Sequence, residues 1–386
     1  MSAPVLLEPV PSVPGQRAAD PGAVLVVRPG RGGVAAFASR ASAELRACGW
    51  RVDELVLPDE GSAMRVALGA TARQRQAIER ADVLHVELGC LDLAPYWFAA
   101  LSSNSRPLVV VAHDAPRVVL APGSGLIGTG SRWRDVVGHR ILSPAVDGVL
   151  ARRVARRAAV GVVLSEGART AWTDDAPRRI VVADHGADPP TPGRCRPSSG
   201  EYALFAGYIG PGKGIDTLLE AWGLIASPSG LPLVIAGGNT GGIEDAAYEG
   251  HLRELSSRLP SPPRWLGFVS DLEFTRLVAE AALVVAPYRR SNPASGVLVR
   301  AMVEGRAVVA TRVPAALDCL EDGVSGLLVE PDDSQALAEA LELAMRDPGL
   351  RDRLGAAAAS TAARRFTWPR YIERLTDAYR IAVDSA

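Results

Sequence analysis

Short apolar runs alternate along the chain with longer segments in which apolar residues recur at helical spacing. In the first half, the runs that predict strands are 23–28, 52–57, 82–87, 107–112, 159–164 and 180–183. An amphipathic helix is expected between the first two of these, ending near Leu45. Short apolar strands that alternate with helical stretches indicate a parallel sheet covered on both faces.

The same pattern restarts after residues 186–200, GADPPTPGRCRPSSG, whose Pro, Gly and Ser predict a linker. The expected strands of the second half are 202–206, 231–236, 264–267, 282–286 and 307–310. The expected helices are 214–226, 244–258, 271–280, 296–304, 314–321 and 334–345, with a terminal helix in 366–383. Two parallel-sheet halves joined by a short linker predict a crevice where the carboxyl ends of strands converge and ligands bind.

Composition excludes several classes of protein. A length of 386 residues fits two domains, and the net charge of −1 argues against a dedicated nucleic-acid binder. The cysteines show no C-x-x-C spacing, which favours reduced thiols over a disulfide or zinc framework; they are Cys48, Cys90, Cys195 and Cys319. We find no apolar stretch long enough to span a bilayer and no signal-like N-terminus, so we expect a soluble, cytoplasmic protein. Residues 1–22 predict a flexible extension.

Two glycine-containing segments carry the candidate chemistry. They are LFAGYIGPGKGI at 203–214 and SGVLVRAMVEGRAVVAT at 295–311, and each has glycines that lead into a predicted helix. This arrangement lets backbone N–H groups approach an anionic phosphate, and Lys213 adds a positive charge to the first segment. Because no G-x-x-x-x-G-K-[ST] loop occurs, the pair predicts a diphosphate of a nucleotide sugar better than a nucleotide hydrolase.

Further motifs extend this pattern over most of the chain. They are AGG at 236–238, LGFVSD at 266–271, ALVVAPY at 282–288, EDGVSGLLVEPDD at 321–333 and the closing FTWPRYIERLTDAY. In the first half they are PGRGGVAAF at 29–37, VVVAHD at 109–114, and VVLSEGAR followed by HGAD at 185–188. With these motifs in this order, the sequence resembles the retaining glycosyltransferases of family 4 over residues 23–383.

The resemblance implies the GT-B fold, an α/β architecture of two Rossmann-like parallel-sheet domains that face each other across a cleft. It places an acceptor-side domain at 23–188, a linker at 189–200 and a nucleotide-sugar-binding domain at 201–367. The last segment, 368–386, is expected to form a helix that returns to the first domain. The implied enzyme is a hexosyltransferase type of glycosyltransferase.

The resemblance also implies roles for particular residues. Lys213 would neutralise the donor diphosphate, and His113 would contact the transferred sugar. The other implied donor-binding residues are Gly32, Gly33, Tyr208, Phe268, Val269, Asn292, Ser295, Gly296, Val297 and Arg300. No metal or other cofactor is expected, because a lysine and helix dipoles can stabilise the leaving group and the chain has no Asp-x-Asp motif. No protein nucleophile is nominated, since retention in this family is assigned to same-face attack.

The chain departs from the family pattern at three positions. The two positions of the family's glutamate pair hold Asn292 and Arg300, and the usual arginine after the glycine is Tyr208. Asn292 can bond a sugar hydroxyl but cannot stabilise a positive charge on the sugar ring. Arg300 has no acceptor for ribose hydroxyls. A variant branch of the family is similar in these respects.

Several candidates also have a structural interpretation. Lys213 could be a solvated helix-start lysine, Gly32–Gly33 a plain turn and His113 a core histidine, whereas His185 fits a hinge or cap better than a ligand. Asn292 and Arg300 could equally be structural. His85 and Glu87 share one strand face as a metal pair would, but a buried, hydrogen-bonded histidine is the favoured interpretation.

The basic segment Arg132–Arg157 has two interpretations. Its helices could rest on anionic lipid, which predicts peripheral contact with the inner face of a membrane, or their arginines could simply face water.

The predicted function is a metal-independent retaining transfer of a sugar from a nucleotide-diphosphate donor to a hydroxyl acceptor. The acceptor could be a glycan, a lipid carrier or a secondary metabolite. A nucleotide-sugar epimerase or hydrolase is less favoured, because the crevice motifs offer chiefly His113 and Asp114 as acid and base. Loss of both family glutamates favours a third possibility, a non-catalytic relative that binds a nucleotide or a partner.

Overall fold

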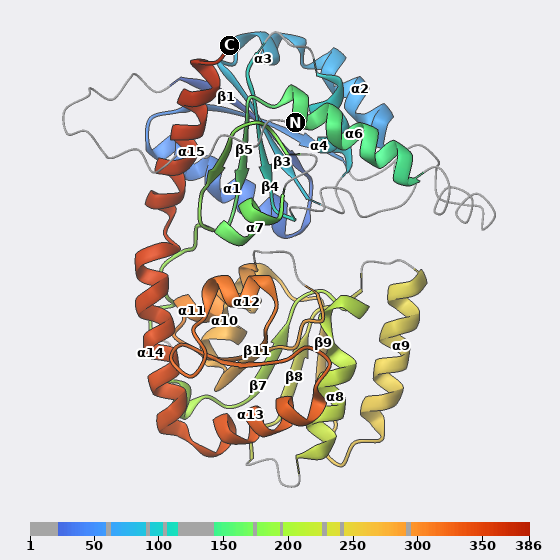
Figure 1. Ribbon diagram of the computed structural model, residues 1–386, viewed down its shortest axis with the longest axis vertical. Helices are drawn as coiled ribbons and strands as arrows, with labels where there is room; N and C mark the ends of the chain where they lie inside the picture. The colour runs from blue at the N-terminus through green and yellow to red at the C-terminus, as the bar shows by residue number, and fades with distance from the viewer. Residues whose placement is uncertain are drawn as a thin grey trace. The chain divides into compact units, whose positions relative to one another are not determined.

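In the computed structural model the chain forms two compact units (Figure 1). The first unit holds residues up to Asp184 and returns for Trp368–Ala386, and the second is His185–Thr367. The structure describes residues 22–58, 63–89, 93–102, 106–114, 143–172, 176–193, 196–225, 230–239, 243–290 and 295–386. The expected extension at 1–22 therefore lies outside these residues except for Gly22.

The first unit is built on one parallel sheet of six strands in the order β2-β1-β3-β4-β5-β6. In chain order the strands are β1 Ala23–Pro29, β2 Arg51–Leu57, β3 Val83–Leu88, β4 Leu108–Ala112, β5 Val160–Val163 and β6 Ile180–Val182. The central strands β3, β4 and β5 are buried along their whole length. Burial on both faces explains why they appear in the sequence as continuous apolar runs rather than alternating ones.

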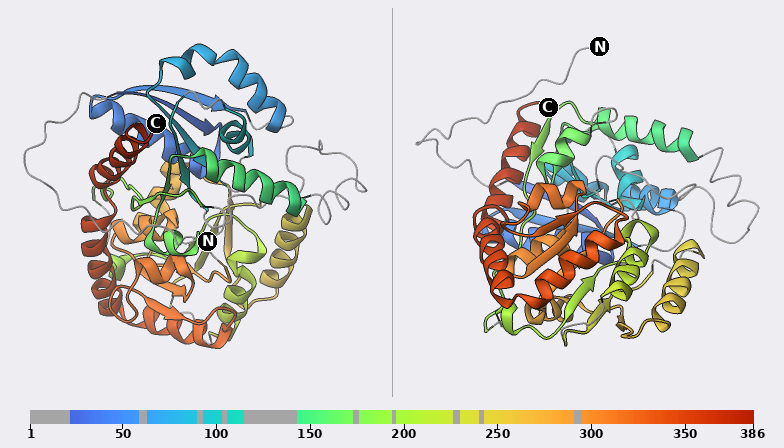
Figure 2. Two further views of the ribbon diagram at one scale, coloured as in Figure 1. Left: turned by 45° about the horizontal axis from the view of Figure 1, so that its top comes forward. Right: turned by 60° about the horizontal axis from the view of Figure 1, so that its bottom comes forward.

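Helices cover both faces of this sheet (Figure 2). On one face α1 (Gly32–Ala47) packs against α15 (Trp368–Val383), which contacts β3, β4, β5 and β6. On the other, α4 (Leu93–Leu101) packs between α2 (Ala63–Arg73) and α6 (Ser143–Arg157). Two short helices complete the unit, α3 (Arg75–Arg80) beside β1 and α7 (Glu166–Ala171) beside β5 and β6. The terminal helix thus belongs to the first unit although it follows the second in the chain.

The second unit is also a parallel six-stranded sheet, in the order β12-β11-β10-β7-β8-β9. Its strands are β7 Ala203–Ala206, β8 Leu233–Ala236, β9 Arg264–Gly267, β10 Leu283–Ala286, β11 Ala307–Thr311 and β12 Leu327–Val329. A short 3-10 turn at Pro197–Ser199 precedes the sheet, and a second one, Pro211–Lys213, follows β7. Because β7 and β10 are adjacent parallel strands, the segments that follow them start side by side at the carboxyl ends of the strands.

The helices of this unit form two groups. Helix α8 (Ile215–Leu224) packs against α9 (Ile243–Ser257) and α13 (Ser334–Arg346). The second group centres on α11 (Gly296–Val303), which packs against α10 (Asp271–Glu280), α12 (Pro314–Cys319) and α14 (Pro348–Arg365). In the part of the chain that the structure describes, no helix is both long and apolar enough to cross a bilayer.

The predicted α/β class with two parallel-sheet domains is confirmed. The sequence pattern predicted neither α4 nor α14, for different reasons. Helix α4 is buried nearly all round, so its sequence LAPYWFAAL has no polar face to give a helical period. Helix α14 is rich in alanine, which gives too little contrast between its faces. The short edge strand β12 was also missed.

Candidate functional site

The glycine-rich segment after β7 forms a tight loop that leads into α8. Gly214 caps this helix with φ 62°, in the left-handed region that favours glycine. A Cβ at this position would also lie 2.0 Å from the carbonyl oxygen of Pro287. The backbone N–H groups of Arg289 and Arg290 donate to the Gly212 carbonyl at 3.0 and 3.2 Å. The loop is therefore fixed against the segment that follows β10.

Lys213 ends this loop, immediately before Gly214. Its Nζ lies 4.2 Å from the centroid of the Tyr288 ring, and the tyrosine itself is buried. A cation held over an aromatic face is stabilised by the negative face of the ring. Lys213 is only half-buried, so its ammonium group is held in place without being withdrawn from solvent.

Arg289 holds the same loop in place, and it was not predicted from the sequence. Its guanidinium group pairs with Asp216 Oδ2 at 2.7 Å and with Asp332. It also donates to Thr217 Oγ1 at 3.1 Å and to the Pro211 carbonyl at 3.3 Å. One side chain thus connects the loop, the first turn of α8 and the turn after β12. No motif marked it, because these partners meet only in the folded chain.

The charge network around Asp216 is strong. Burial alone would raise the pKa of this carboxyl group, but hydrogen bonds from Arg289 and Tyr248 and the positive charge of Arg289 lower it below its ordinary value. The same carboxylates raise the pKa of Arg289. Asp216 and Arg289 are therefore an ion pair at neutral pH.

The start of α11 lies next to the glycine loop. A Cβ on Gly207 would come within 3.9 Å of Val297 Cγ2. Ser295 caps the helix, and its Oγ accepts from the Leu298 N–H at 3.4 Å. The first turn at Gly296 and Val297 is at least partly exposed, so its backbone N–H groups can reach an anion. The structure thus brings together the two segments that the sequence singled out.

His185 contacts this helix start from the other side. A Cβ on Gly296 would lie 3.4 Å from His185 Nε2, while Nδ1 lies 2.7 Å from the Gly186 carbonyl oxygen. Since a carbonyl only accepts, Nδ1 carries a proton. His185 therefore packs against the helix start, and its role as a hinge or cap stays a prediction.

Arg300 is held mainly by backbone and by one carboxylate. Its Nη1 lies 3.1 Å from Glu304 Oε1 and donates to the carbonyls of Asp188 and Pro189 at 3.4 and 3.5 Å. The buried Glu304 carboxylate also accepts from Thr191, from N–H at 3.0 Å and from Oγ1 at 2.8 Å. These contacts are structural, and they tie part of the predicted linker to the second unit. Asn292 lies outside the described residues.

The remaining predicted donor residues of this unit follow strands of the same sheet. Tyr208 comes two residues after β7, and Phe268 and Val269 follow β9. Phe268 is 73% exposed, and its ring covers Gly238, where a Cβ would lie 2.5 Å from ring atom Cε2. An exposed ring beside a glycine backbone gives this end of the sheet a flat apolar surface.

In the first unit, His113 directly follows β4 and lies against a buried carboxylate. Its Nε2 is 2.7 Å from Glu87 Oε2, and His85 Nε2 is 3.1 Å from the other oxygen, Glu87 Oε1. His85 Nδ1 is in turn 2.5 Å from the Tyr379 hydroxyl of α15. The favoured interpretation of His85, a buried hydrogen-bonded histidine, agrees with this geometry. Glu87 is therefore a further functional candidate. From the sequence it was considered only as one of two possible metal ligands, together with His85.

Electrostatics keep Glu87 ionised. Burial pushes its pKa upward, but the charge interactions with His85 and His113 and the hydrogen bonds from both rings outweigh it and lower the pKa to about 2. Burial, together with the nearby Glu87 charge, raises the pKa values of Tyr371 and Tyr379 well above their ordinary range. At pH 7 Glu87 is therefore an ionised carboxylate buried beside two neutral tyrosine hydroxyl groups.

Gly32 and Gly33 begin α1, at the end of β1. Gly32 has φ 87°, both residues are exposed, and a Cβ on either would meet nothing within 4 Å. The same helix carries Phe37, whose ring meets the His113 ring edge to face at 5.2 Å between centroids. The two glycines are therefore tied to the His113 neighbourhood through one helix, and their contact with phosphate stays a prediction.

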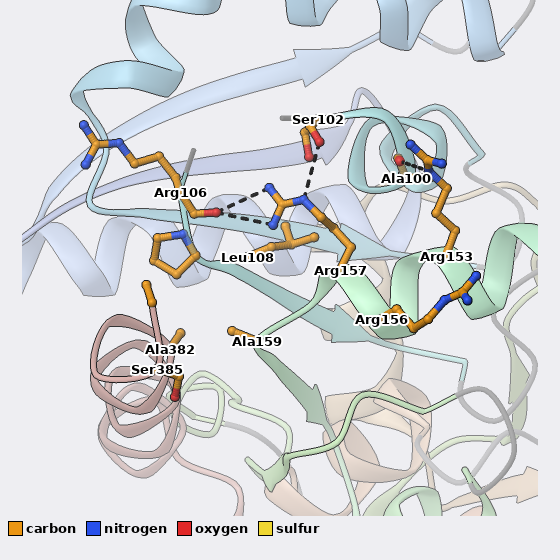
Figure 3. A pocket seen from close by; sticks show the side chains of 12 residues that line it. Ala100, Ser102, Arg106, Leu108, Arg153, Arg156, Arg157, Ala159, Ala382 and Ser385 are labelled. Atoms are coloured by element: carbon orange, nitrogen blue, oxygen red, sulfur yellow. Dashed lines mark hydrogen bonds between the residues drawn. The ribbon is translucent and has the colours of Figure 1, made fainter. Parts of the chain in front are cut away.

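One cavity of the first unit, about 550 Å³, lies at the opposite end of the strands from His113, where β4 and β5 begin. Figure 3 shows two of its arginines donating to backbone: Arg157 to the carbonyls of Ser102 and Arg106 at 3.4 and 3.3 Å, and Arg153 to that of Ala100 at 2.6 Å. Helices α4, α6 and α15 all end here, and arginine is favourable at the negative carboxyl end of a helix. These arginines are therefore caps. Residues 132–142 of the predicted basic segment lie outside the described residues.

Comparison with solved structures identifies the class of fold. The chain is similar to HepE of Anabaena, solved with UDP and glucose, with a TM-score of 0.68, 20% identity, and coverage of 92% of this chain and 98% of that one. It is also similar to sucrose-phosphate synthase of Thermosynechococcus elongatus, with a TM-score of 0.73, 17% identity, and coverage of 95% and 100%. The chain therefore has the GT-B fold, with two Rossmann-like domains.

Comparison of sequences identifies the family of the second unit. Residues 200–347 match the family described as glycosyl transferases group 1, so the second unit carries a domain of that family. The chain is 36% identical over 201 residues to D-inositol 3-phosphate glycosyltransferase of a Nocardioides species, covering 48% of this chain and 43% of that protein. It is 34% identical over 191 residues to phosphatidyl-myo-inositol mannosyltransferase of Mycobacterium leprae, covering 49% of each. The chain thus spans about half the length of these relatives.

Proposed function

We propose that this chain is a glycosyltransferase that moves a sugar from a nucleotide-diphosphate donor to a hydroxyl acceptor, with retention of configuration and without a metal. The observation that carries the proposal is the meeting, within one unit, of the Lys213 loop and the start of α11. Membership of residues 200–347 in the glycosyl transferases group 1 family supports it.

The chemistry follows from where negative charge develops. Breaking the bond between sugar and phosphate leaves a nucleoside diphosphate with one additional negative charge, which must be stabilised as it forms. Lys213 supplies a cation that Tyr288 holds in place, and the first turn of α11 supplies N–H groups and the positive end of a helix dipole. Fixed donors of this kind need no reorganisation during the reaction, so they stabilise the transition state more than the ground state.

The remaining donor contacts are proposed from the ends of strands in both units. The segment at Phe268 and Val269 would receive the nucleotide base, and Tyr208 would lie near the phosphates. Gly32 and Gly33 of the first unit would approach the phosphates, and His113 would contact the transferred sugar. Arg300 is proposed only as a support for this site, because its Nη1 is already engaged by Glu304.

The first donor to test is UDP-glucose, because HepE has been solved with UDP and with UDP-glucose. Purified protein is screened by thermal shift against UDP-glucose, GDP-mannose and ADP-glucose, and a donor held at 100 times its Kd should stabilise the fold by about 2.7 kcal/mol. The donor that raises the Tm is then incubated with acceptors that include inositol phosphates, phosphatidylinositol vesicles and oligosaccharides.

Release of nucleoside diphosphate that depends on the acceptor supports the proposal. Loss of that release in Lys213→Ala, with the Tm of the free protein unchanged, supports the site. Product formed equally well without any acceptor would instead indicate a nucleotide-sugar hydrolase or epimerase. The anomeric configuration of the product, read by proton coupling constants, tests retention, and turnover in excess EDTA tests independence from metal.

One observation favours a second function, the binding of a nucleotide without catalysis. Arg300 stands at a position of the family's glutamate pair, and its contacts are structural. Calorimetric titration that shows donor binding, together with no turnover across the acceptor panel, would favour this alternative over the transferase.

We also propose a cytoplasmic location, with peripheral contact to anionic membrane through helix α6. Arg152 and Arg156 are exposed, and Arg156 donates to the Arg152 carbonyl of its own helix, at 3.3 Å. Arg153 and Arg157 instead donate to carbonyls outside α6, so Arg152 and Arg156 are the arginines proposed for lipid. Co-flotation with phosphatidylglycerol vesicles that Arg152→Glu/Arg156→Glu abolishes would support this contact, and flotation unaffected by the double variant would contradict it.

A further inference from the structure

We propose that Glu87 is the positioning residue of His113: its buried carboxylate fixes the ring plane of that imidazole and holds it as the Nε2–H tautomer. This inference deepens the proposed function and rests on it for the role of His113 beside the sugar. It is carried by a chain of hydrogen bonds that runs from α15 through β3 to the end of β4.

The direction of each hydrogen bond follows from what each group can do. An ionised carboxylate only accepts, so His113 Nε2 and His85 Nε2 must both donate to Glu87. A neutral imidazole carries one proton, so Nδ1 of each ring is then an acceptor. The Tyr379 hydroxyl completes the chain by donating to His85 Nδ1. With both rings neutral, each of these hydrogen bonds has one assignment, and Nδ1 of His113 carries no proton.

Burial makes this assignment strict. Glu87 and Tyr379 are fully buried and His85 is 1% exposed, so water cannot replace a lost partner. An unsatisfied carboxylate in such surroundings is costly, which resists any rotation of His113 that would break its bond to Oε2. The backbone adds to the restraint, because the His113 N–H donates to the Leu88 carbonyl at 3.0 Å.

These hydrogen bonds also give the terminal helix a function in the first unit. Tyr379 lies 294 residues after His85, yet it fixes the ring that shares Glu87 with His113. Helix α15 carries a second buried tyrosine, Tyr371, whose hydroxyl has no hydrogen-bond partner among the described residues. Tyr371→Phe is therefore a matched control for Tyr379→Phe: it changes the same helix at the same burial and removes a hydroxyl near Glu87, but it breaks no hydrogen bond of the network.

The test uses the full chain labelled with ¹⁵N-histidine, of which it has five residues, with His113→Asn to assign the signals. In the wild type we expect His113 to show a protonated Nε2 and an unprotonated Nδ1. In Glu87→Gln the amide can donate as well as accept, so we expect a mixture of tautomers or inversion at one ring. In parallel, kcat should fall about 10- to 100-fold, the range seen when a group that orients a metal-ligating histidine is removed, while donor KM changes less than about threefold.

Tyr379→Phe should change the His85 signals and lower kcat, whereas Tyr371→Phe should leave both as in the wild type. Should Glu87→Gln fail to fold, this tyrosine pair still decides the matter. The proposal is overturned if His113 keeps the Nε2–H signature and wild-type kcat in Glu87→Gln, or if the two tyrosine variants behave alike. If His113 shows the expected signals but the protein turns over no donor, the transferase function is contradicted. The positioning of His113 by Glu87 would still stand.

Discussion

The Lys213 ammonium group and the Tyr288 ring lie 4.2 Å apart, measured from Nζ to the ring centroid, so the cation of the phosphate loop rests on a buried aromatic face. Tyr288 follows β10 and Lys213 follows β7, two strands that pair in the sheet. The ring therefore fixes the position of the cation relative to the segment that leads into α11.

The first prediction concerns Lys213 itself. Lys213→Ala should lower kcat/KM about 10²- to 10³-fold, the effect of removing one fixed group that stabilises developing negative charge. The Tm should change little, because the side chain is half-buried and its one described aromatic contact contributes about 0.5–1 kcal/mol. Steady-state kinetics and calorimetry measure the two effects. Tyr288→Phe is the control, since it keeps the ring face and should keep most of the activity.

A second prediction separates Arg289 from its neighbour Arg290. Arg289→Leu removes the ion pairs to Asp216 and Asp332, so the free energy of unfolding should fall by about 1–3 kcal/mol and donor KM should rise about tenfold. Arg290→Leu keeps the backbone bond to Gly212 and should change both quantities little. Urea unfolding and initial-rate kinetics measure them. Equal effects of the two variants would contradict the role given to Arg289.

The sequence predicted the fold well because the central strands of both sheets are short and buried on both faces. Apolar runs such as those at β4 and β10 are short enough for strands, and the helical segments between them favour a parallel sheet. Boundaries differed by one or two residues, as at β1. The pattern failed where polarity did not alternate, in the nearly fully buried α4 and the alanine-rich α14.

The candidate site was predicted only as far as local motifs reach. Lys213 and Ser295 stood out because glycines and a helix start lie beside them in the chain. Arg289 and Glu87 did not, since their functions depend on partners distant in sequence. A glutamate inside an apolar strand was the one available signal for Glu87. That signal indicated a buried charge, but it did not indicate that the carboxylate bonds to both His85 and His113.

The third prediction tests the backbone of the phosphate loop. Gly214→Ala combines a left-handed φ of 62° with a Cβ placed 2.0 Å from the Pro287 carbonyl oxygen. Gly193→Ala imposes a similar φ of 71° with nothing within 4 Å. Gly193→Ala should cost about 1–2 kcal/mol for the conformation alone, whereas Gly214→Ala should cost more and displace Lys213. Urea unfolding and donor titration distinguish them, and equal costs would show that the contact with Pro287 is absent.

The final prediction concerns pH and Glu87. Its pKa is about 2 in the folded chain, against an ordinary value of 4.5, so the native state favours the ionised form. A carboxyl group with a lowered folded-state pKa stabilises the fold above its unfolded pKa. That contribution disappears as pH falls from about 4.5 toward 2, because the unfolded chain takes up the proton first. The difference between these two pKa values corresponds to about 3 kcal/mol.

Replacement by glutamine removes this titration. The free energy of unfolding of Glu87→Gln should be lower than that of the wild type at pH 7, and the difference should narrow as pH falls through 4 toward 2. Urea unfolding at a series of pH values measures both curves. Tyr371→Phe serves as a second reference, because it alters a buried group of α15 without removing an ionisable carboxylate and should follow the wild-type slope. Parallel curves for wild type and Glu87→Gln across this interval would mean that the carboxylate is not stabilised by its two histidines, and the positioning role would lose its electrostatic basis.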